Sequence, residues 1–130
     1  CGKDEENRNP YLPEVGFRFE ANLNLPLYSP LTNTGSAIYI DNQGVGIRGV
    51  FVINKGFDQF FAWEASCPNH APNACSTMDL NSQTVICSCE DFEYSLFTGQ
   101  QLNRPDDGKP YYDLLFYNTS FDGTTVVISN

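Results

Sequence analysis

The sequence is short of basic residues and of long apolar runs, and both shortages exclude functions. Seven lysines and arginines stand against sixteen aspartates and glutamates, which gives a formal net charge of −9 over 130 residues. Such a surface repels phosphate backbones, so we expect no nucleic-acid partner. No apolar run is longer than four residues, as at Val50–Ile53, so no stretch here is long enough to span a bilayer as a helix.

Helical periodicity and the motifs of common active sites are also missing. The sequence contains no clear amphipathic helix, internal repeat, glycine-rich phosphate loop or nucleophile elbow. Apolar residues nevertheless make up 41% of the chain, which is enough to close one hydrophobic core. We therefore expect a single folded domain that is not an enzyme.

Alternation of apolar and polar residues predicts short β-strands. It is clearest at residues 17–25, where Phe17, Phe19 and Ala21 alternate with polar side chains. Further strands are expected at 37–40, 47–53, 60–65, 114–120 and 124–129, the last two flanking a turn at 121–123. Short strands about ten residues apart, separated by glycine and asparagine, predict an all-β sandwich or barrel.

The beginning of the sequence predicts attachment to a membrane. Cys1 and Gly2 precede a polar, partly acidic run, and together they resemble the start of a bacterial lipoprotein whose cysteine thiol carries the lipid. Residues 1–14 are expected to form a flexible tether and residues 15–130 the folded domain. This interpretation predicts a lipid-anchored protein of the cell envelope, periplasmic or exposed on the outer membrane. The alternative is that Cys1 carries no lipid.

The other four cysteines and the only histidine are gathered between residues 67 and 89. They follow the pattern C-x2-H-x4-C-x11-C-x-C, which lacks the repeated C-x2-4-C knuckles of a zinc ribbon. Four cysteines in a small exported domain most often form two disulfides. Cys87 and Cys89 are too close in sequence to bond readily to each other, so two of the three connectivities are favoured. The residues concerned are Cys67, His70, Cys75, Cys87 and Cys89.

Three stretches around these cysteines carry a resemblance to a known family. In the first, Ala62, Ala65 and Ser66 precede Cys67; the second is VICSC at 85–89; the third is FEYSLFTG at 92–99, followed by Leu102 and Pro105. On these motifs the sequence, from about residue 17 to 129, resembles a Rieske domain of the cytochrome bc type. The resemblance implies an antiparallel β-sandwich or barrel with a small subdomain of two cysteine-containing loops.

The resemblance further implies a [2Fe–2S] centre held by two cysteines and two histidines. By match to the family motif, Cys67 and Cys87 occupy the thiolate positions, and Cys75 and Cys89 occupy those of a disulfide between the loops. Cys67 and Cys87 would face each other without a metal, so we expect them to form a second disulfide in an oxidising compartment.

The histidine positions of the family motif are not preserved. His70 lies one residue farther from Cys67 than the family's C-x-H spacing allows, and the first loop is three residues longer. Glu90 stands at the second histidine position, and Asp91 replaces the glycine that follows. Because the chain contains a single histidine, it does not supply a standard Cys2His2 ligand set.

Three hypotheses follow for the cysteine-containing loops. The first, which we favour, is a structural or binding module without a metal, stabilised by two disulfides and contacting an unknown protein partner. The second is an electron carrier whose [2Fe–2S] centre uses Cys67, Cys87, His70 and Glu90 and passes electrons to an unknown redox partner. The third is a zinc site formed by His70 with three of the cysteines.

Overall fold

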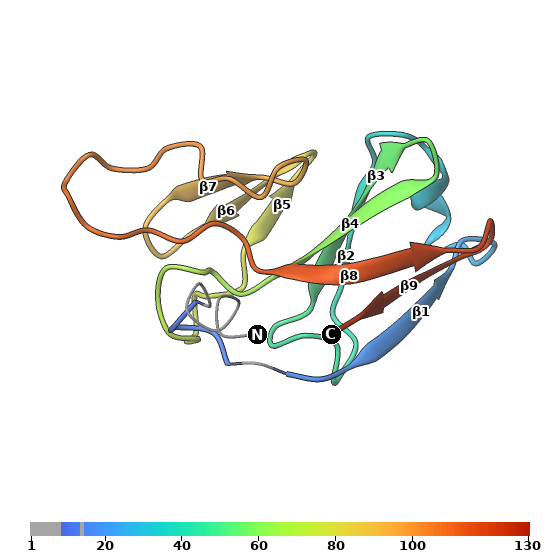
Figure 1. Ribbon diagram of the computed structural model, residues 1–130, viewed down its shortest axis with the longest axis horizontal. Coiled ribbons are helices and arrows are strands. Elements are labelled where there is room, and N and C mark those ends of the chain that lie inside the picture. Colours follow the sequence, from blue (N-terminus) through green and yellow to red (C-terminus); the bar gives the residue numbers. More distant parts are fainter. Residues whose placement is uncertain (1–8, 14) are drawn as a thin grey trace, which may run out of the picture.

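The structure is a computed structural model, and it describes residues 9–13 and 15–130. Nine strands form two antiparallel sheets among these residues, and the small sheet lies beside one end of the large one (Figure 1). The expected all-β fold is confirmed. The strands are β1 (Arg18–Asn22), β2 (Ala37–Ile40), β3 (Val50–Gly56), β4 (Gln59–Glu64), β5 (Asp79–Asn81), β6 (Thr84–Cys87), β7 (Phe92–Ser95), β8 (Phe116–Phe121) and β9 (Thr125–Ser129).

The large sheet has the order β1-β9-β8-β4-β3-β2, and the small sheet has the order β5-β6-β7. The turn between β8 and β9 forms because the carboxylate of Asp122 accepts hydrogen bonds from the backbone N–H groups of Thr124 (2.9 Å) and Thr125 (2.8 Å). Gly123 there has a φ of 101°, which favours glycine. Strand β1, which the alternation of apolar and polar residues predicted, pairs with β9 from the other end of the chain.

Two clusters of buried side chains form the core. One packs against the large sheet and includes Val52, Ala62, Tyr117 and Ile128. The other fills the space between the large and small sheets and includes Trp63, Cys67 and Cys87. The small sheet is thus attached to the large one by its own hydrophobic core.

Trp63 on β4 fixes the position of the small sheet. Its indole N–H donates a hydrogen bond of 2.8 Å to the carbonyl of Leu96, just after β7. Gly99 lies against the same indole with a φ of 75°, and a Cβ at this position would come within 2.6 Å of the ring. Only glycine combines this backbone conformation with so close an approach.

Glu64, at the end of β4, is a fully buried carboxylate that organises a neighbouring loop. One oxygen accepts hydrogen bonds from the Ile47 N–H (2.7 Å) and the Tyr117 hydroxyl (2.5 Å). The other accepts from the N–H groups of Arg48 (2.8 Å) and Ser66 (2.9 Å). Four donors satisfy a group that would otherwise be costly to bury, and they fix the chain as it leaves β4.

The strands expected from alternation did not include β5, β6 and β7 of the small sheet, and three further features differ from the sequence-based expectations. Residues 47–49 are not part of β3, because the loop containing them turns to bond Glu64. A short 3-10 helix, Ser29–Thr32, was not expected. Leu12 is buried and the Asn9 side chain donates to the Pro68 carbonyl (2.6 Å), so the folded part includes residues expected to belong to the tether.

The predicted lipid attachment at Cys1 lies outside the described residues. No helix in residues 9–13 and 15–130 has the length and apolar character needed to cross a membrane.

We expect Gly99→Ala to destabilise the protein by more than about 2 kcal/mol, because the added methyl group combines a strained φ with overlap of the Trp63 ring. Gly108→Ala is the matched control, since Gly108 has a φ of 77° and no neighbour within 4 Å of the added Cβ. Its cost should be about 1 kcal/mol from strain alone. Urea unfolding of both variants measures the difference; equal losses would contradict the role assigned to Gly99.

Candidate metal centre

Two loops at one end of the molecule bring the cysteines and the histidine together. The first loop, residues 67–76, follows β4, and its ends are held together by a hydrogen bond from the Cys67 N–H to the Ser76 carbonyl (2.8 Å). The second loop, residues 88–91, joins β6 to β7. Asp91 closes this turn with a φ of 59°, at the position where the family motif has glycine. Strand ends far apart in the sequence therefore position the two loops.

A disulfide joins the loops. Cys75 in the first loop is bonded to Cys89 in the second, with their Cα atoms 5.6 Å apart. This is the pairing that the resemblance implies. Asn73 braces the bridge, because its side-chain oxygen accepts hydrogen bonds from the Cys75 N–H (2.9 Å) and the buried Ser76 hydroxyl (3.0 Å).

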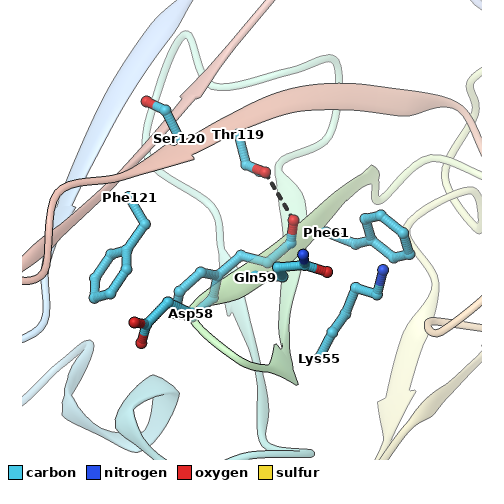
Figure 2. A pocket seen from close by; sticks show the side chains of 8 residues that line it. Lys55, Asp58, Gln59, Phe61, Thr119, Ser120 and Phe121 are labelled. Atoms are coloured by element: carbon cyan, nitrogen blue, oxygen red, sulfur yellow. Dashed lines mark hydrogen bonds between the residues drawn. The ribbon is translucent and has the colours of Figure 1, made fainter.

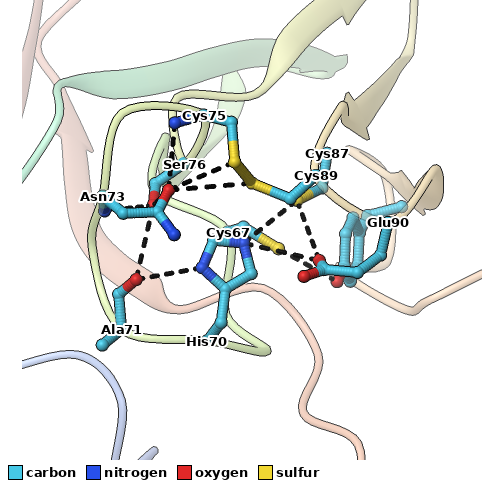
Figure 3. Close-up of a disulfide and its surroundings, with 10 residues drawn as sticks. Cys67, His70, Ala71, Asn73, Cys75, Ser76, Cys87, Cys89 and Glu90 are labelled. Atoms are coloured by element: carbon cyan, nitrogen blue, oxygen red, sulfur yellow. Dashed lines mark hydrogen bonds and ion pairs between the residues drawn. A yellow bond between two sulfur atoms is a disulfide. The ribbon is translucent and has the colours of Figure 1, made fainter.

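Beside the disulfide, four side chains from the two loops and from the last residue of β6 are directed toward one another (Figure 3). One donor atom of each of Cys67, His70, Cys87 and Glu90 lies within 4.8 Å of all the others. Nε2 of His70 is 3.4 Å from Sγ of Cys87 and 3.4 Å from Oε2 of Glu90. Sγ of Cys87 is 3.5 Å from the same Glu90 oxygen. The arrangement is a compact group of two sulfurs, one nitrogen and one oxygen.

The two sulfurs lie inside the protein and the other two donors near its surface. Cys67 and Cys87 are fully buried, whereas the side chains of His70 and Glu90 are 17% and 40% exposed. Hydrogen bonding with Cys87 lowers the pKa of the Cys67 thiol, and the same pairing raises the pKa of Cys87.

A hydrogen-bonded chain behind Cys67 supports a negative charge on its sulfur. The hydroxyl oxygen of Tyr94 accepts a hydrogen bond from the Asn69 amide (2.6 Å) and lies 3.7 Å from Sγ of Cys67. Burial raises the pKa of Tyr94, so the hydroxyl keeps its proton and is able to donate it to the sulfur when Cys67 is a thiolate. Asn69 is itself fixed by the backbone of Tyr112, whose N–H donates to it (2.7 Å) and whose carbonyl accepts from it (3.0 Å).

His70 is oriented by the backbone of its own loop. Its Nδ1 lies 2.9 Å from the carbonyl of Ala71, which only accepts, so Nδ1 carries a proton and Nε2 faces the sulfurs. Burial lowers the pKa of His70, but the hydrogen bonds to Ala71 and Cys87 and the charge of Glu90 outweigh it and raise the pKa overall. The ring is thus held with one nitrogen directed toward the group.

The structure groups these residues differently from two of the expectations. Cys67 and Cys87 are unbonded thiols, so the expected second disulfide is not formed. A zinc site with three cysteines is not formed either, because Cys75 and Cys89 are joined to each other. The mixed set of Cys67, Cys87, His70 and Glu90 does converge.

Sequence reasoning assigned no role to Asn69 or Asn73, and gave Tyr94 only a place in the hairpin motif. The signal for the asparagines was their position in a loop rich in asparagine and proline, where their side chains commonly bond the backbone. The signal for Tyr94 was a single hydroxyl in an otherwise apolar strand face.

A second concavity lies elsewhere, between the β3–β4 turn and β8 (Figure 2). Lys55 lies 3.7 Å from the ring centre of Phe61, and the Thr119 hydroxyl donates to the Phe60 carbonyl (2.7 Å). The ammonium group and the hydroxyl group thus already have partners within the protein, and the described residues lining the concavity include neither cysteine nor histidine. The two-loop group is therefore the stronger candidate for function.

Comparison with known proteins supports the fold. A scan of the sequence against protein-family models found no match, and neither did a search of the curated proteins. The cyanobacterial plasma membrane Rieske protein from Synechocystis PCC 6803 is a similar solved structure, with 22% identity and a TM-score of 0.52 over 72% of this chain and 85% of its own.

Two further structures have the same fold. The ferredoxin of carbazole 1,9a-dioxygenase from Nocardioides aromaticivorans IC177 is 20% identical, with a TM-score of 0.51 over 88% of this chain and 97% of its own. The apo form of a quaternary ammonium Rieske monooxygenase is 13% identical, with a TM-score of 0.57 over 95% of this chain and 35% of its own. The expected Rieske fold is confirmed.

Replacing both Cys75 and Cys89 by serine should lower the free energy of unfolding by about 3 kcal/mol, because the bridge closes a loop of about 15 residues in the unfolded chain. Denaturant unfolding measures the loss. A reductant should destabilise the unaltered protein by a similar amount and leave the double variant unchanged. A double variant as stable as the unaltered chain would contradict the role of the bridge.

Proposed function

We propose that this chain is a non-enzymatic Rieske-fold domain of the cell envelope that does not carry a [2Fe–2S] centre and acts as a structural or binding module for another protein. The observation that carries the proposal is the 3.4 Å separation between Nε2 of His70 and Sγ of Cys87. These two atoms would be ligands of different irons in a Rieske centre.

The donor group does not fit the binuclear centre on two counts. Bridging sulfides hold the two irons apart and the outer ligands point away from them, so a thiolate and an imidazole on different irons lie farther apart than two ligands of one ion. Here all four donor atoms lie within 4.8 Å. The second count is chemical: Glu90 would put an anionic oxygen where the centre has a neutral imidazole.

One specific observation favours the second candidate function, that of an electron carrier. Cys67 and Cys87 are unbonded thiols at the two positions that match cluster ligands, and the Tyr94 hydroxyl is placed to stabilise a thiolate at Cys67. Such a carrier would need a redox partner to supply or accept its electron. It would also need the two loops to separate enough to admit two irons and two sulfides.

The proposal predicts a colourless protein. Material isolated from its own envelope, or from a host with cluster-assembly machinery, should contain less than about one-tenth of an inorganic sulfide per chain and show none of the visible absorption of an iron–sulfur centre. Iron and sulfide analysis and an absorption spectrum measure this. Two irons and two sulfides per chain would overturn the proposal and establish the electron carrier.

The envelope location is part of the proposal, and Cys1 followed by the acidic residues Asp4, Glu5 and Glu6 supports it. Acyl chains on Cys1 would hold the acidic domain at a membrane surface that its net charge otherwise repels. When the protein is produced with a lipoprotein export signal ahead of Cys1, we expect it to partition into the detergent phase and Cys1→Ser to remain in the aqueous phase. Aqueous partitioning of both would contradict the lipid anchor.

A further inference from the structure

We propose that Cys67, Cys87, His70 and Glu90 form a closed tetrahedral site for a single divalent cation of the zinc type. The inference rests on the proposed function in one respect, namely that no [2Fe–2S] centre occupies the same position. It goes beyond it by assigning the four side chains a common ligand. The ion would join the two loops a second time, beside the disulfide.

Three of the six distances among the four donor atoms match those of a single tetrahedron, and the Cys67 sulfur lies within 4.8 Å of the other three atoms. Metal–sulfur bonds of about 2.3 Å and metal–nitrogen or metal–oxygen bonds of about 2.0–2.2 Å put sulfur about 3.5–3.6 Å from nitrogen or oxygen, and nitrogen about 3.4 Å from oxygen. The structure has 3.4 Å between His70 and Cys87, 3.5 Å between Cys87 and Glu90, and 3.4 Å between His70 and Glu90. One ion therefore fits at the centre with little movement of these three side chains.

The groups behind the donors are those that orient metal ligands. The proton on Nδ1 of His70 is directed to the Ala71 carbonyl, which leaves Nε2 to supply the bonding lone pair. The Tyr94 hydroxyl lies 3.7 Å from the Cys67 sulfur and accepts a hydrogen bond from the Asn69 amide. These contacts hold His70 and Cys67 at two vertices of the coordination tetrahedron before any ion binds.

The donor set favours zinc over the common alternatives. Two thiolates are soft ligands that magnesium and calcium do not take, and imidazole suits zinc. Zinc also binds such sites more tightly than ferrous iron. With four protein ligands and no open position, the site matches structural zinc, so we infer a role in holding the loops and not in catalysis.

Binding of the ion releases protons from the thiols. Each thiol that binds gives up its proton to solvent, and the two thiolates and the Glu90 carboxylate bring three negative charges against the two positive charges of the ion. The imidazole binds through its neutral form. The loaded site therefore has a net charge of about −1, and zinc affinity should rise with pH as the thiols lose their protons.

The test is zinc analysis of the natively isolated, full-length protein, combined with titration by zinc and by cobalt(II). We expect one zinc per chain and, with cobalt, the intense visible bands of a tetrahedral thiolate complex. Because the chain has a single histidine, the nitrogen shifts of its one imidazole should also show Nε2 bound to the metal and Nδ1 protonated.

Glu90→Gln should weaken zinc binding by at least about tenfold, and His70→Ala should do the same, because each removes one of four ligands. Glu90 and His70 are partly exposed, so both variants should fold. Glu93→Gln is the matched control, because Glu93 lies on the adjacent strand β7 and is not one of the four residues; its zinc affinity should change by less than about twofold.

The possible results separate this inference from the proposed function. Iron with inorganic sulfide would overturn both. A metal-free protein with a Cys67–Cys87 disulfide, or with free thiols that bind neither zinc nor cobalt, would overturn the zinc site and leave the proposed function standing. Equal affinities of the Glu90 and Glu93 variants would overturn the assignment of Glu90 as a ligand.

Discussion

The candidate site depends on the approach of two loops that leave different sheets. The first follows β4 of the large sheet, and the second joins β6 to β7 of the small sheet. The Trp63 hydrogen bond and the core between the sheets fix the distance between them, and the Cys75–Cys89 disulfide joins the loops themselves. Neither loop alone has enough donors to hold an ion, so the site exists only because the two sheets are held at a fixed position relative to each other.

The buried carboxylate of Glu64 extends this constraint to the start of the first loop. It accepts a hydrogen bond from the Ser66 N–H and so holds the backbone one residue before Cys67. On the other side, Tyr94 and Asn69 connect the Cys67 thiol to the backbone at Tyr112. A donor held from two sides loses little entropy on binding a ligand, which is the physical content of preorganisation.

The sequence was a good guide to the strands and a partial guide to the site. Period-two alternation located most of the large sheet, because half-buried strands alternate by necessity. It did not reveal that residues 47–49 leave β3, since Ile47 and Arg48 bond a carboxylate that lies 17 and 16 residues later in the sequence. Spacing made His70 look displaced, but the longer loop bends back on itself and returns the imidazole to the sulfurs. Such a loop conformation depends on hydrogen bonds between side chains and the backbone, which the spacing of residues in the sequence does not reveal.

The replacement of a histidine position by Glu90 changes which metals the site favours. A carboxylate adds a third negative charge to those of the two thiolates. This charge offsets the charge of a divalent ion, whereas a binuclear centre already contains negatively charged sulfide, so the divalent ion is favoured. Zinc has no accessible redox change, so a domain that binds it in this way gives up electron transfer and keeps only the mechanical role of the centre. With zinc bound, the same four positions would stabilise the tip of the fold that the two loops form.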